Sequence, residues 1–295
     1  MKLLIVTQKV DRNDPILGFF HRWIEELANN FEKVTVICLG KGEFNLPRVK
    51  VLSLGKGEGV SKLTYLFRFY KYIWGERNNY DAVFVHMNQE YVLLGWKVWF
   101  ILGKKIYLWR NHAKGNLLTD LAVLLSNKVF CTSPSSYTAR FKKTKIMPVG
   151  IDTNFFKPDP NIIREKNSVL LLGRISPVKK VIEFIDWVKS GSYRATIAGP
   201  ILAEDKEYGA LILKSLTPNI KYIGPVTQEE ARKLYQTHEI YANFTSAGSM
   251  DKTIFEAVAC GAKLIVHNPD LKNGFDVLDH SLTALMDKLE ACLEE

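Results

Sequence analysis

Short apolar runs alternate with amphipathic stretches along the first half of the chain. The apolar runs predict buried strands over residues 3–6, 34–39, 49–54, 82–86, 105–109 and 128–132. The stretches between them predict helices over residues 19–29, 60–74, 89–103 and 115–126. One face of the first helix carries four large apolar side chains, Phe20, Trp23, Ile24 and Leu27. Strands that alternate with helices in this way predict a parallel sheet covered on both faces.

The second half repeats this pattern. It predicts strands over residues 169–173, 195–198, 220–224, 240–244 and 263–266, and helices over residues 179–189, 205–215, 227–236, 252–260 and 281–293. Prolines cluster between Met147 and Pro160, as expected of a linker. We therefore expect an α/β protein with two Rossmann-like, doubly wound domains, residues 1–149 and 150–295, facing one another across a cleft. The last helix is expected to pack back on the first domain.

Basic residues are concentrated in the first half of the chain. Residues 1–149 contain 23 lysines and arginines against 11 acidic residues, a net charge of +12, whereas residues 150–295 carry a net charge of −3. Such asymmetry indicates a polyanionic partner for the first half, namely a membrane surface, an anionic acceptor or nucleic acid. Because the sequence shows no nucleic-acid-binding module, we expect no nucleic acid as a partner.

Cysteine usage and the first residues both favour a reduced, cytoplasmic setting. The four cysteines form no CxxC pair, which argues against a zinc site and favours core positions. Met1–Val6 is a short apolar run followed at once by polar residues, so we expect a strand and not a signal peptide. The most apolar window, Tyr91–Trp109, is interrupted by three lysines, so we expect no membrane-spanning helix.

Aromatic and basic residues are interleaved in two predicted helices of the first half. They are Lys62, Tyr65, Arg68, Tyr70, Lys71, Tyr72 and Trp74, together with Trp96, Lys97 and Trp99. One interpretation is a surface that meets an anionic membrane, making the protein peripheral on the inner face of the cell membrane beside a lipid-linked acceptor. The alternative is an aromatic core face with solvated lysines.

A small, polar loop joins a predicted strand to a predicted helix in the second domain. The segment Thr245–Asp251 follows an apolar run, and Gly261 is expected to end the helix that begins at Lys252. A helix N-terminus behind such a loop offers free backbone N–H groups and the positive end of a dipole. Both favour a phosphate.

Two cations, Arg174 and Lys179, follow an apolar strand that ends at Gly173. A guanidinium fork and an ammonium group at a strand end can hold a diphosphate. The alternative is a solvated pair of surface cations at the start of a helix. Cations there oppose the helix dipole, which favours the functional interpretation.

Glu256 lies on the helix after the polar loop and has two interpretations. Its carboxylate could accept hydrogen bonds from ribose hydroxyls. It could instead close a capping box with Thr253, because the two residues have the required Thr-x-x-Glu spacing. The residues alone leave both interpretations open.

Four motifs in the second half occur in a recognisable order. They are Pro148-Val149-Gly150-Ile151-Asp152-Thr153-x-x-Phe156, Gly173-Arg174-x-x-x-x-Lys179, Tyr222-Ile223-Gly224-Pro225-Val226 and Glu256-Ala257-Val258-Ala259-Cys260-Gly261-Ala262. Over residues 145–268 their order and spacing resemble those of family-4-type retaining glycosyltransferases of the GT-B fold (glycosyl transferases group 1). The first half resembles this family less, in a first strand, a glycine near Gly18 and a helix that ends in Glu26-Leu27-Ala28.

The resemblance implies a hexosyltransferase that moves a sugar, with retention and without a metal or other cofactor, from a nucleoside-diphosphate sugar to a glycan or lipid-linked acceptor. The pathway would be polysaccharide or glycolipid biosynthesis. By position, Arg174 and Lys179 would bind the donor diphosphate, Glu256 the ribose, and Val226 would lie near the base. The sugar and phosphate would contact a loop formed by Gly248, Ser249, Met250, Asp251, Lys252 and Thr253. The first domain would bind the acceptor.

The chain departs from the family at Gly248, where a glutamate that contacts the transferred sugar is usual. Asp251 would replace that carboxylate or, as we favour, cap the helix. Lys252 would add charge at the phosphate or face solvent. The departure leaves the donor open, with two alternatives to the transferase: a catalytically inactive nucleotide-sugar-binding protein and a nucleotide-sugar epimerase of the same fold.

Three residues of the first half are further candidates. His112 follows a predicted strand and resembles the family's cleft histidine, which helps to place the reacting sugar, although a surface-loop histidine is the alternative. His86 ends the preceding strand, and we favour a role outside catalysis for it. Gly18 would let the first loop approach the donor, or would be a plain turn glycine.

Overall fold

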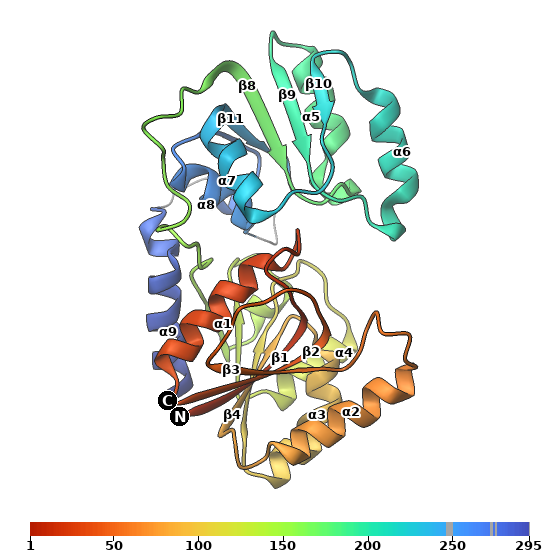
Figure 1. Cartoon of the computed structure of the whole chain (residues 1–295), viewed down its shortest axis with the longest axis vertical. Coiled ribbons are helices and arrows are strands. Elements are labelled where there is room, and N and C mark those ends of the chain that lie inside the picture. The colour runs from red at the N-terminus through yellow and green to blue at the C-terminus, as the bar shows by residue number, and fades with distance from the viewer. Residues whose placement is uncertain (246–249, 272–273, 275, 295) are drawn as a thin grey trace. The chain divides into compact units, whose positions relative to one another are not determined.

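The computed structural model describes residues 1–245, 250–271, 274 and 276–294 (Figure 1). The chain forms two compact units. Unit 1 comprises Met1–Met147 and the chain from Met286 onward, and unit 2 comprises Pro148–Leu285. Unit 1 therefore ends two residues before the boundary expected from the sequence, and it includes the end of the last helix, α9 (Leu282–Glu294).

Unit 1 is built on a parallel sheet, to which the described part of the chain contributes seven strands in the order β3-β2-β1-β4-β5-β6-β7. These are β1 (Lys2–Val10), β2 (Lys33–Lys41), β3 (Val49–Ser53), β4 (Ala82–His86), β5 (Lys105–Trp109), β6 (Lys128–Cys131) and β7 (Thr144–Ile146). Successive residues of β1, from Leu3 to Val6, are all fully buried. A strand covered on both faces needs such a continuous apolar run, which explains the sequence pattern.

Three helices cover one face of this sheet: α2 (Lys62–Gly75), α3 (Glu90–Ile101) and α4 (Leu117–Leu125) (Figure 1). Ile73, Val92 and Val123, one from each helix, share a core with Leu4 and Val6 of β1. The three helices are thus packed side by side over the same strands, with α3 in contact with both neighbours.

The opposite face of the unit 1 sheet is covered by α1 (Gly18–Asn30) and the end of α9. Trp23 of α1 meets Trp109 of β5 edge to face, with ring centroids 4.9 Å apart. The Tyr107 hydroxyl donates to the Leu293 carbonyl oxygen over 3.0 Å. The apolar face predicted for the first helix is confirmed, because its four side chains are at most 1% exposed.

Unit 2 holds a second parallel sheet, with described strands in the order β10-β9-β8-β11-β12. They are β8 (Glu165–Leu172), β9 (Arg194–Ala198), β10 (Ile220–Tyr222), β11 (His238–Asn243) and β12 (Lys263–Val266). The helices are α5 (Val181–Lys189), α6 (Lys206–Ser215), α7 (Gln228–Thr237) and α8 (Lys252–Ala259). Val169 of β8 packs towards α5 and α6, whereas Leu170 packs towards α7 and α8, so helices cover both faces.

The predicted α/β class and the predicted strands and helices are confirmed, with small shifts at their ends. The sequence pattern missed β7, because Thr144-Lys145-Ile146 is a short strand at the sheet edge and has no apolar run. In the described part of the chain, no helix combines the length and the apolar character needed to cross a membrane. All four cysteines are buried and unpaired, as expected of core residues.

Candidate functional site

The order of strands in unit 2 reverses between β8 and β11. β9 and β10 extend the sheet on one side of β8, whereas β11 and β12 extend it on the other. In doubly wound sheets the carboxyl ends of the strands at such a switch point form the usual ligand site. Gly173–Lys179 follows β8, and Asp251–Glu256 lies between β11 and β12. The fold therefore brings the two candidate segments to one end of the same sheet.

Two glycine backbones meet at the end of β8. Gly173 and Gly199 have φ values of +154° and +138°, and the Gly173 N–H donates to the Ala198 carbonyl oxygen over 3.0 Å. A Cβ atom on Gly199 would lie 1.9 Å from the Gly173 carbonyl oxygen. A side chain at Gly199 would therefore displace the turn that carries Arg174.

Arg174 follows this turn with its side chain 40% exposed. Its Nε lies 3.8 Å from Oδ2 of Asp205, and its Nη1 lies 3.9 Å from Oε1 of Glu204. These separations exceed hydrogen-bonding distance. The Asp205 Oδ2 atom is buried and has no hydrogen-bond partner among the described residues. The two carboxylates attract the guanidinium group while leaving its N–H donors available to a ligand.

Lys179 is held by a carboxylate from the start of α8. Its Nζ donates to Oδ2 of Asp251 over 2.6 Å, and Thr245 Oγ1 and Asn243 Nδ2 donate to the same oxygen over 2.8 and 3.0 Å. Burial alone would raise the pKa of Asp251. Attraction to Lys179 and these three hydrogen bonds outweigh burial, so the pKa lies below its usual value of 3.8. The ammonium keeps two further N–H donors for another partner.

Asp251 occupies the N-cap position of α8 but does not cap it. The side chain makes no hydrogen bond to the first turn of the helix, because its carboxylate is directed to Lys179. The prediction that Asp251 caps the helix is therefore wrong. A full positive charge binds a carboxylate more strongly than a backbone N–H does. The first turn of α8 is left without a side-chain cap, and this favours an external acceptor.

Lys252, the first residue of α8, is tied to the main chain at the start of unit 2. Its Nζ donates to the carbonyl oxygens of Val149 and Gly150 over 2.5 and 2.8 Å. Burial lowers the pKa of Lys252 to about 7, and the negative charge of Glu256 opposes this shift. The expectation that Lys252 simply faces solvent is wrong, because its ammonium binds backbone carbonyl groups. Its expected charge at the phosphate stays a prediction.

Glu256 is buried on α8, with only 6% of its surface exposed. The Tyr235 hydroxyl of α7 donates to Oε2 of Glu256 over 3.0 Å. Thr253 is the second residue of α8, and its Oγ1 accepts a hydrogen bond from the Tyr241 hydroxyl over 2.7 Å. A capping box needs Thr253 at the N-cap position, which Asp251 occupies. The capping-box interpretation of Thr253 and Glu256 is therefore wrong.

The sequence and the fold are similar to those of known proteins. Residues 179–295 match a family described as glycosyl transferase-like. The chain is similar to Anabaena Alr3699/HepE, solved in complex with UDP and glucose, with a TM-score of 0.72 and 18% identity over 90% of this chain and 80% of that one. The chain has the GT-B fold.

Two further GT-B structures show how widely this fold is used. Sucrose-phosphate synthase from Thermosynechococcus elongatus matches with a TM-score of 0.71 and 13% identity over 99% of this chain and 90% of that one. UDP-GlcNAc 2-epimerase from Neisseria meningitidis, bound to UDP-GlcNAc, matches with a TM-score of 0.57 and 13% identity over 98% and 92%. No curated protein sequence matches the chain. The resemblance read from the motifs is confirmed at the level of the fold and of the matched family segment.

The other candidate residues of unit 2 lie partly in its core and partly outside the described residues. Val226 and Met250 are partly buried and pack against the core beneath α7 and α8. Gly248 and Ser249 lie outside the residues that the structure describes. Asn243 was not among the expected site residues, and Thr245 was expected only as part of the polar loop, although both donate to Asp251.

In unit 1 the candidate residues are spread over two strand ends and a helix. His112 is exposed on the loop after β5, and its Nδ1 lies 3.0 Å from the Lys114 backbone nitrogen. His86 is buried, with its ring stacked on Phe20 at a centroid distance of 3.8 Å, as befits a core histidine. Gly18 is the first residue of α1 and has no positive φ, so the helix itself does not require glycine there.

Within the described ranges, no three His, Cys, Asp or Glu side chains come together so that they could hold a metal ion. Burial raises the pKa of Cys260, which follows the last residue of α8, to about 12. This thiol therefore stays protonated near neutral pH and is a poor nucleophile.

Proposed function

We propose that this protein is a retaining glycosyltransferase that moves a hexose from a nucleoside-diphosphate sugar to a glycan or lipid-linked acceptor. The observation that carries the proposal is the meeting of Arg174, Lys179 and the start of α8 at the switch point of the unit 2 sheet. The family match of residues 179–295 supports it. The GT-B fold shared with HepE, which was solved with UDP and glucose, supports it further.

Sugar transfer needs positive charge at the leaving group. When the bond between the anomeric carbon and the diphosphate breaks, negative charge develops on the diphosphate, and fixed donors stabilise that transition state. Arg174 offers a fork for two oxygens, Lys179 offers its remaining ammonium donors, and the first turn of α8 offers backbone N–H groups. On this basis we propose that the reaction proceeds without a metal ion.

Retention is proposed to arise from attack on the face from which the diphosphate leaves. The carboxylates of the α8 segment are engaged, because Asp251 accepts three hydrogen bonds on one oxygen and Glu256 is buried against Tyr235. A covalent sugar intermediate on either carboxylate would have to break these contacts. In the proposed reaction a phosphate oxygen of the donor takes the proton of the acceptor hydroxyl.

The remaining roles follow from the family resemblance. Glu256 is proposed to hold the ribose and Val226 to lie near the base, while the loop that contains Gly248 contacts the sugar and phosphate. His112 is proposed to help place the reacting sugar. Its exposed ring on the loop after β5 supports this assignment, because the group is accessible to a ligand.

The acceptor is proposed to meet unit 1, whose outer helices expose large apolar side chains. Leu63 and Phe67 of α2 are 78% and 69% exposed, Phe100 of α3 is 78% exposed, and Leu117 and Leu124 of α4 are 80% and 70% exposed. Because α3 touches both α2 and α4, these side chains belong to one surface, the α2–α4 surface. An apolar surface of this kind marks a contact with a membrane or another protein.

Cations on the α2–α4 surface favour an anionic membrane as its partner. Lys62, Lys71 and Lys97 are exposed on α2 and α3. Apolar side chains that enter the lipid interface, combined with cations that reach headgroup phosphates, are typical of peripheral membrane proteins. We therefore propose that the protein works at the inner face of the cell membrane.

The aromatic part of this surface differs from the sequence-based expectation. Trp99 is fully buried, and Tyr65, Tyr72 and Trp96 pack partly against the core, so the core interpretation is right for these four. Trp74 is 54% exposed and remains a surface residue. The surface depends mainly on leucine and phenylalanine side chains, which the sequence-based expectation did not include.

A thermal-shift panel of nucleoside diphosphates and their sugars, followed by assays of donor hydrolysis and transfer, tests the proposal. One nucleotide should raise the melting temperature of the wild type and of Arg194→Ala, whose arginine is exposed at the start of β9. The same nucleotide should not stabilise Arg174→Ala. Slow release of sugar from the matching donor would support catalysis. A transfer product that keeps the anomeric configuration of the donor would support retention.

Other outcomes separate the alternatives. Binding without turnover, even with acceptor extracts, would indicate a nucleotide-sugar-binding protein. Conversion of the donor to its 2-epimer would indicate an epimerase. Absence of any nucleotide-dependent stabilisation would refute the proposal altogether.

A further inference from the structure

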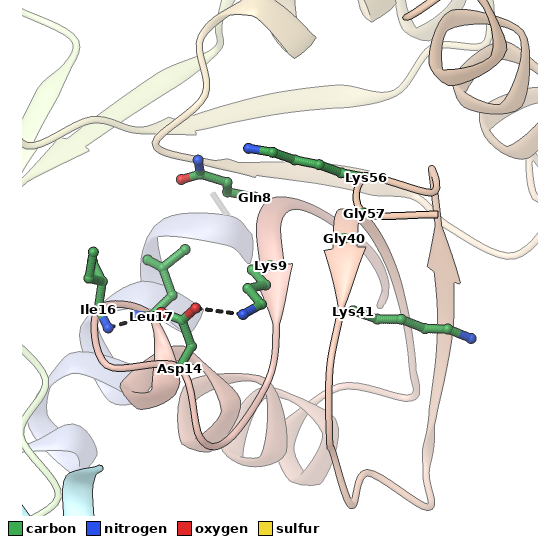
Figure 2. Close-up of a pocket in the computed structure, with 9 residues that line it drawn as sticks. All are labelled: Gln8, Lys9, Asp14, Ile16, Leu17, Gly40, Lys41, Lys56 and Gly57. Atoms are coloured by element: carbon green, nitrogen blue, oxygen red, sulfur yellow. Dashed lines mark hydrogen bonds and ion pairs between the residues drawn. The ribbon is translucent and has the colours of Figure 1, made fainter. Parts of the chain in front are cut away.

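Unit 1 contains a pocket of about 360 Å³ where β1, β2 and β3 end (Figure 2). Its lining combines five polar side chains, those of Gln8, Lys9, Asp14, Lys41 and Lys56, with the apolar Ile16 and Leu17 that precede α1. This position, beyond the carboxyl ends of parallel strands, is where doubly wound sheets bind ligands. The pocket uses none of the residues assigned above to the donor.

The two outer lysines come from a short sequence that occurs twice. Leu39-Gly40-Lys41-Gly42-Glu43 ends β2, and Leu54-Gly55-Lys56-Gly57-Glu58 follows β3. The parallel pairing of Cys38 with Ser53 places both copies in the same register, and the Lys56 N–H donates to the Leu39 carbonyl oxygen over 2.8 Å. The repeat therefore presents two lysines at equivalent points of neighbouring strands.

The glutamates of the two copies do not neutralise these lysines. Glu43 lies 3.7 Å from Arg12, and Glu58 lies 3.1 Å from Arg68. Lys41 and Lys56 are exposed, and neither forms an ion pair within the described part of the chain. The double motif thus supplies positive charge that the fold itself does not use.

The remaining cation, Lys9, pairs with two carboxylates, which leaves one of its three N–H donors for a ligand. Its ammonium lies 2.9 Å from Asp11 and 2.8 Å from Asp14, which also accepts the backbone N–H groups of Ile16 and Leu17. Figure 2 shows Lys56 extending towards Gln8, whereas Lys41 extends away from it. Lys56 and the Gln8 amide are consequently the donors best placed to meet a ligand, with Lys41 adding charge at the rim.

We infer that this pocket binds a phosphate ester carried by the acceptor. The inference rests on the proposed transferase function, since the pocket belongs to the unit proposed to meet the acceptor. A phosphate accepts hydrogen bonds on several oxygens and can therefore take donors from Lys56, Gln8 and Lys9 together. Ile16, which is 45% exposed, offers an apolar contact to the group that carries the phosphate.

Residue-resolved NMR of the full-length, deuterated and ¹⁵N-labelled protein tests this site. Inorganic phosphate is added at constant ionic strength, and the amide signals of Gly40, Lys56 and Gly57 are followed. Saturating shifts are expected in the wild type and in Lys105→Gln/Lys142→Gln, a double variant that removes two exposed lysines outside the pocket. Lys41→Gln/Lys56→Gln should weaken binding by about tenfold. Shifts that never saturate, or that are unchanged by Lys41→Gln/Lys56→Gln, would overturn the inference.

A variant that should bind phosphate more tightly tests the site independently, because misfolding cannot increase affinity. Asp14→Asn keeps an oxygen for the N–H groups of Ile16 and Leu17 but removes one of the two negative charges beside Lys9. Phosphate should then bind about threefold more tightly, because a partly exposed charge interaction of this kind is weak. Unchanged or weaker phosphate binding by folded Asp14→Asn would contradict the inferred role of Lys9.

Two carriers of the same phosphate chemistry distinguish its source. Glucose 1-phosphate represents a soluble sugar phosphate, and dihexanoylphosphatidic acid below its micelle concentration represents a lipid headgroup. Saturating shifts at Gly57 with either probe support the site, and tighter binding of one identifies the carrier. Failure of both would overturn the assignment to an acceptor.

The same spectra report separately on the proposed function. A nucleoside diphosphate should shift the amide signals of Gly173 and Arg174 in unit 2. If those signals do not respond while Gly57 responds to phosphate, the donor proposal fails and the anion site stands. If only Gly173 and Arg174 respond, the further inference fails and the donor proposal stands.

Discussion

The ammonium group of Lys179 lies 2.6 Å from the carboxylate of Asp251, although 72 residues separate them in sequence. This pair joins the turn after β8 to the start of α8 inside one unit. The contact also orients both side chains. The Asp251 carboxylate does not cap α8, and the Lys179 side chain lies beside Gly173. The donor site proposed here is therefore organised before any ligand binds, which favours stabilisation of a developing charge.

Replacing Asp251 by asparagine should lower the free energy of unfolding at pH 7 by about 2 kcal/mol, since Lys179 then loses its partner in a largely buried position. The pKa of Asp251 is lowered in the folded state. Its contribution is therefore present above the unfolded value of 3.8 and is lost as the pH falls through the folded pKa. Urea unfolding at several pH values measures this.

The difference between wild type and Asp251→Asn should shrink below about pH 4. Asp159→Asn, which changes a carboxylate on a surface turn, is the control for loss of one negative charge. An equal loss of stability at pH 7 and pH 3 would contradict the ion-pair explanation.

The fold could be predicted largely from the sequence, because both sheets are buried on two faces. Continuous apolar runs such as Leu3–Val6 and Val169–Leu172 admit few other interpretations, and the helices between them fix the parallel topology. β7 could not be predicted, since it is stabilised by pairing with β6 and not by its own apolar residues.

The candidate site was less predictable, because its details depend on contacts between distant residues. Spacing alone left a capping box of Thr253 and Glu256 open as one of two interpretations and favoured Asp251 as a helix cap. The Lys179 contact and the helix start at Lys252 change both interpretations. The binding of Lys252 to the carbonyl groups of Val149 and Gly150 joins segments about one hundred residues apart, and no local pattern signals it.

Lys252 should make stability depend on pH in the alkaline range. Its folded pKa is about 7, below the usual 10.5, so between these values the unfolded state binds a proton that the folded state has released. Stability contributed by this group therefore rises as the pH increases from 7 to 10.5. The rise should be absent in Lys252→Met. Chemical unfolding across this range, with Lys105→Met as the control for loss of an exposed lysine, provides the measurement.

Gly199→Ala should destabilise unit 2 by about 3 kcal/mol, because the new Cβ atom cannot occupy the space taken by the Gly173 carbonyl oxygen and φ is positive there. The turn that holds Arg174 should move with it, so nucleotide binding should weaken as well. Gly75→Ala is the matched control, since a Cβ atom there meets nothing within 4 Å. If the two variants have the same melting temperature and nucleotide affinity, the backbone contact is not a constraint.

Membrane attachment through the α2–α4 surface is tested by substituting its most exposed leucines. Leu117→Ser/Leu124→Ser should reduce flotation with anionic liposomes by roughly tenfold, because two side chains that enter the lipid interface lose their apolar area. Leu211→Ser/Leu213→Ser on α6 removes two leucines that are 52% and 46% exposed, but in unit 2, and should float like the wild type.

Flotation should also fall with added salt, since the exposed lysines of α2 and α3 contribute through headgroup charge. Equal flotation of both leucine variants would place the attachment elsewhere, and indifference of the wild type to anionic lipid would remove the membrane from the proposed function.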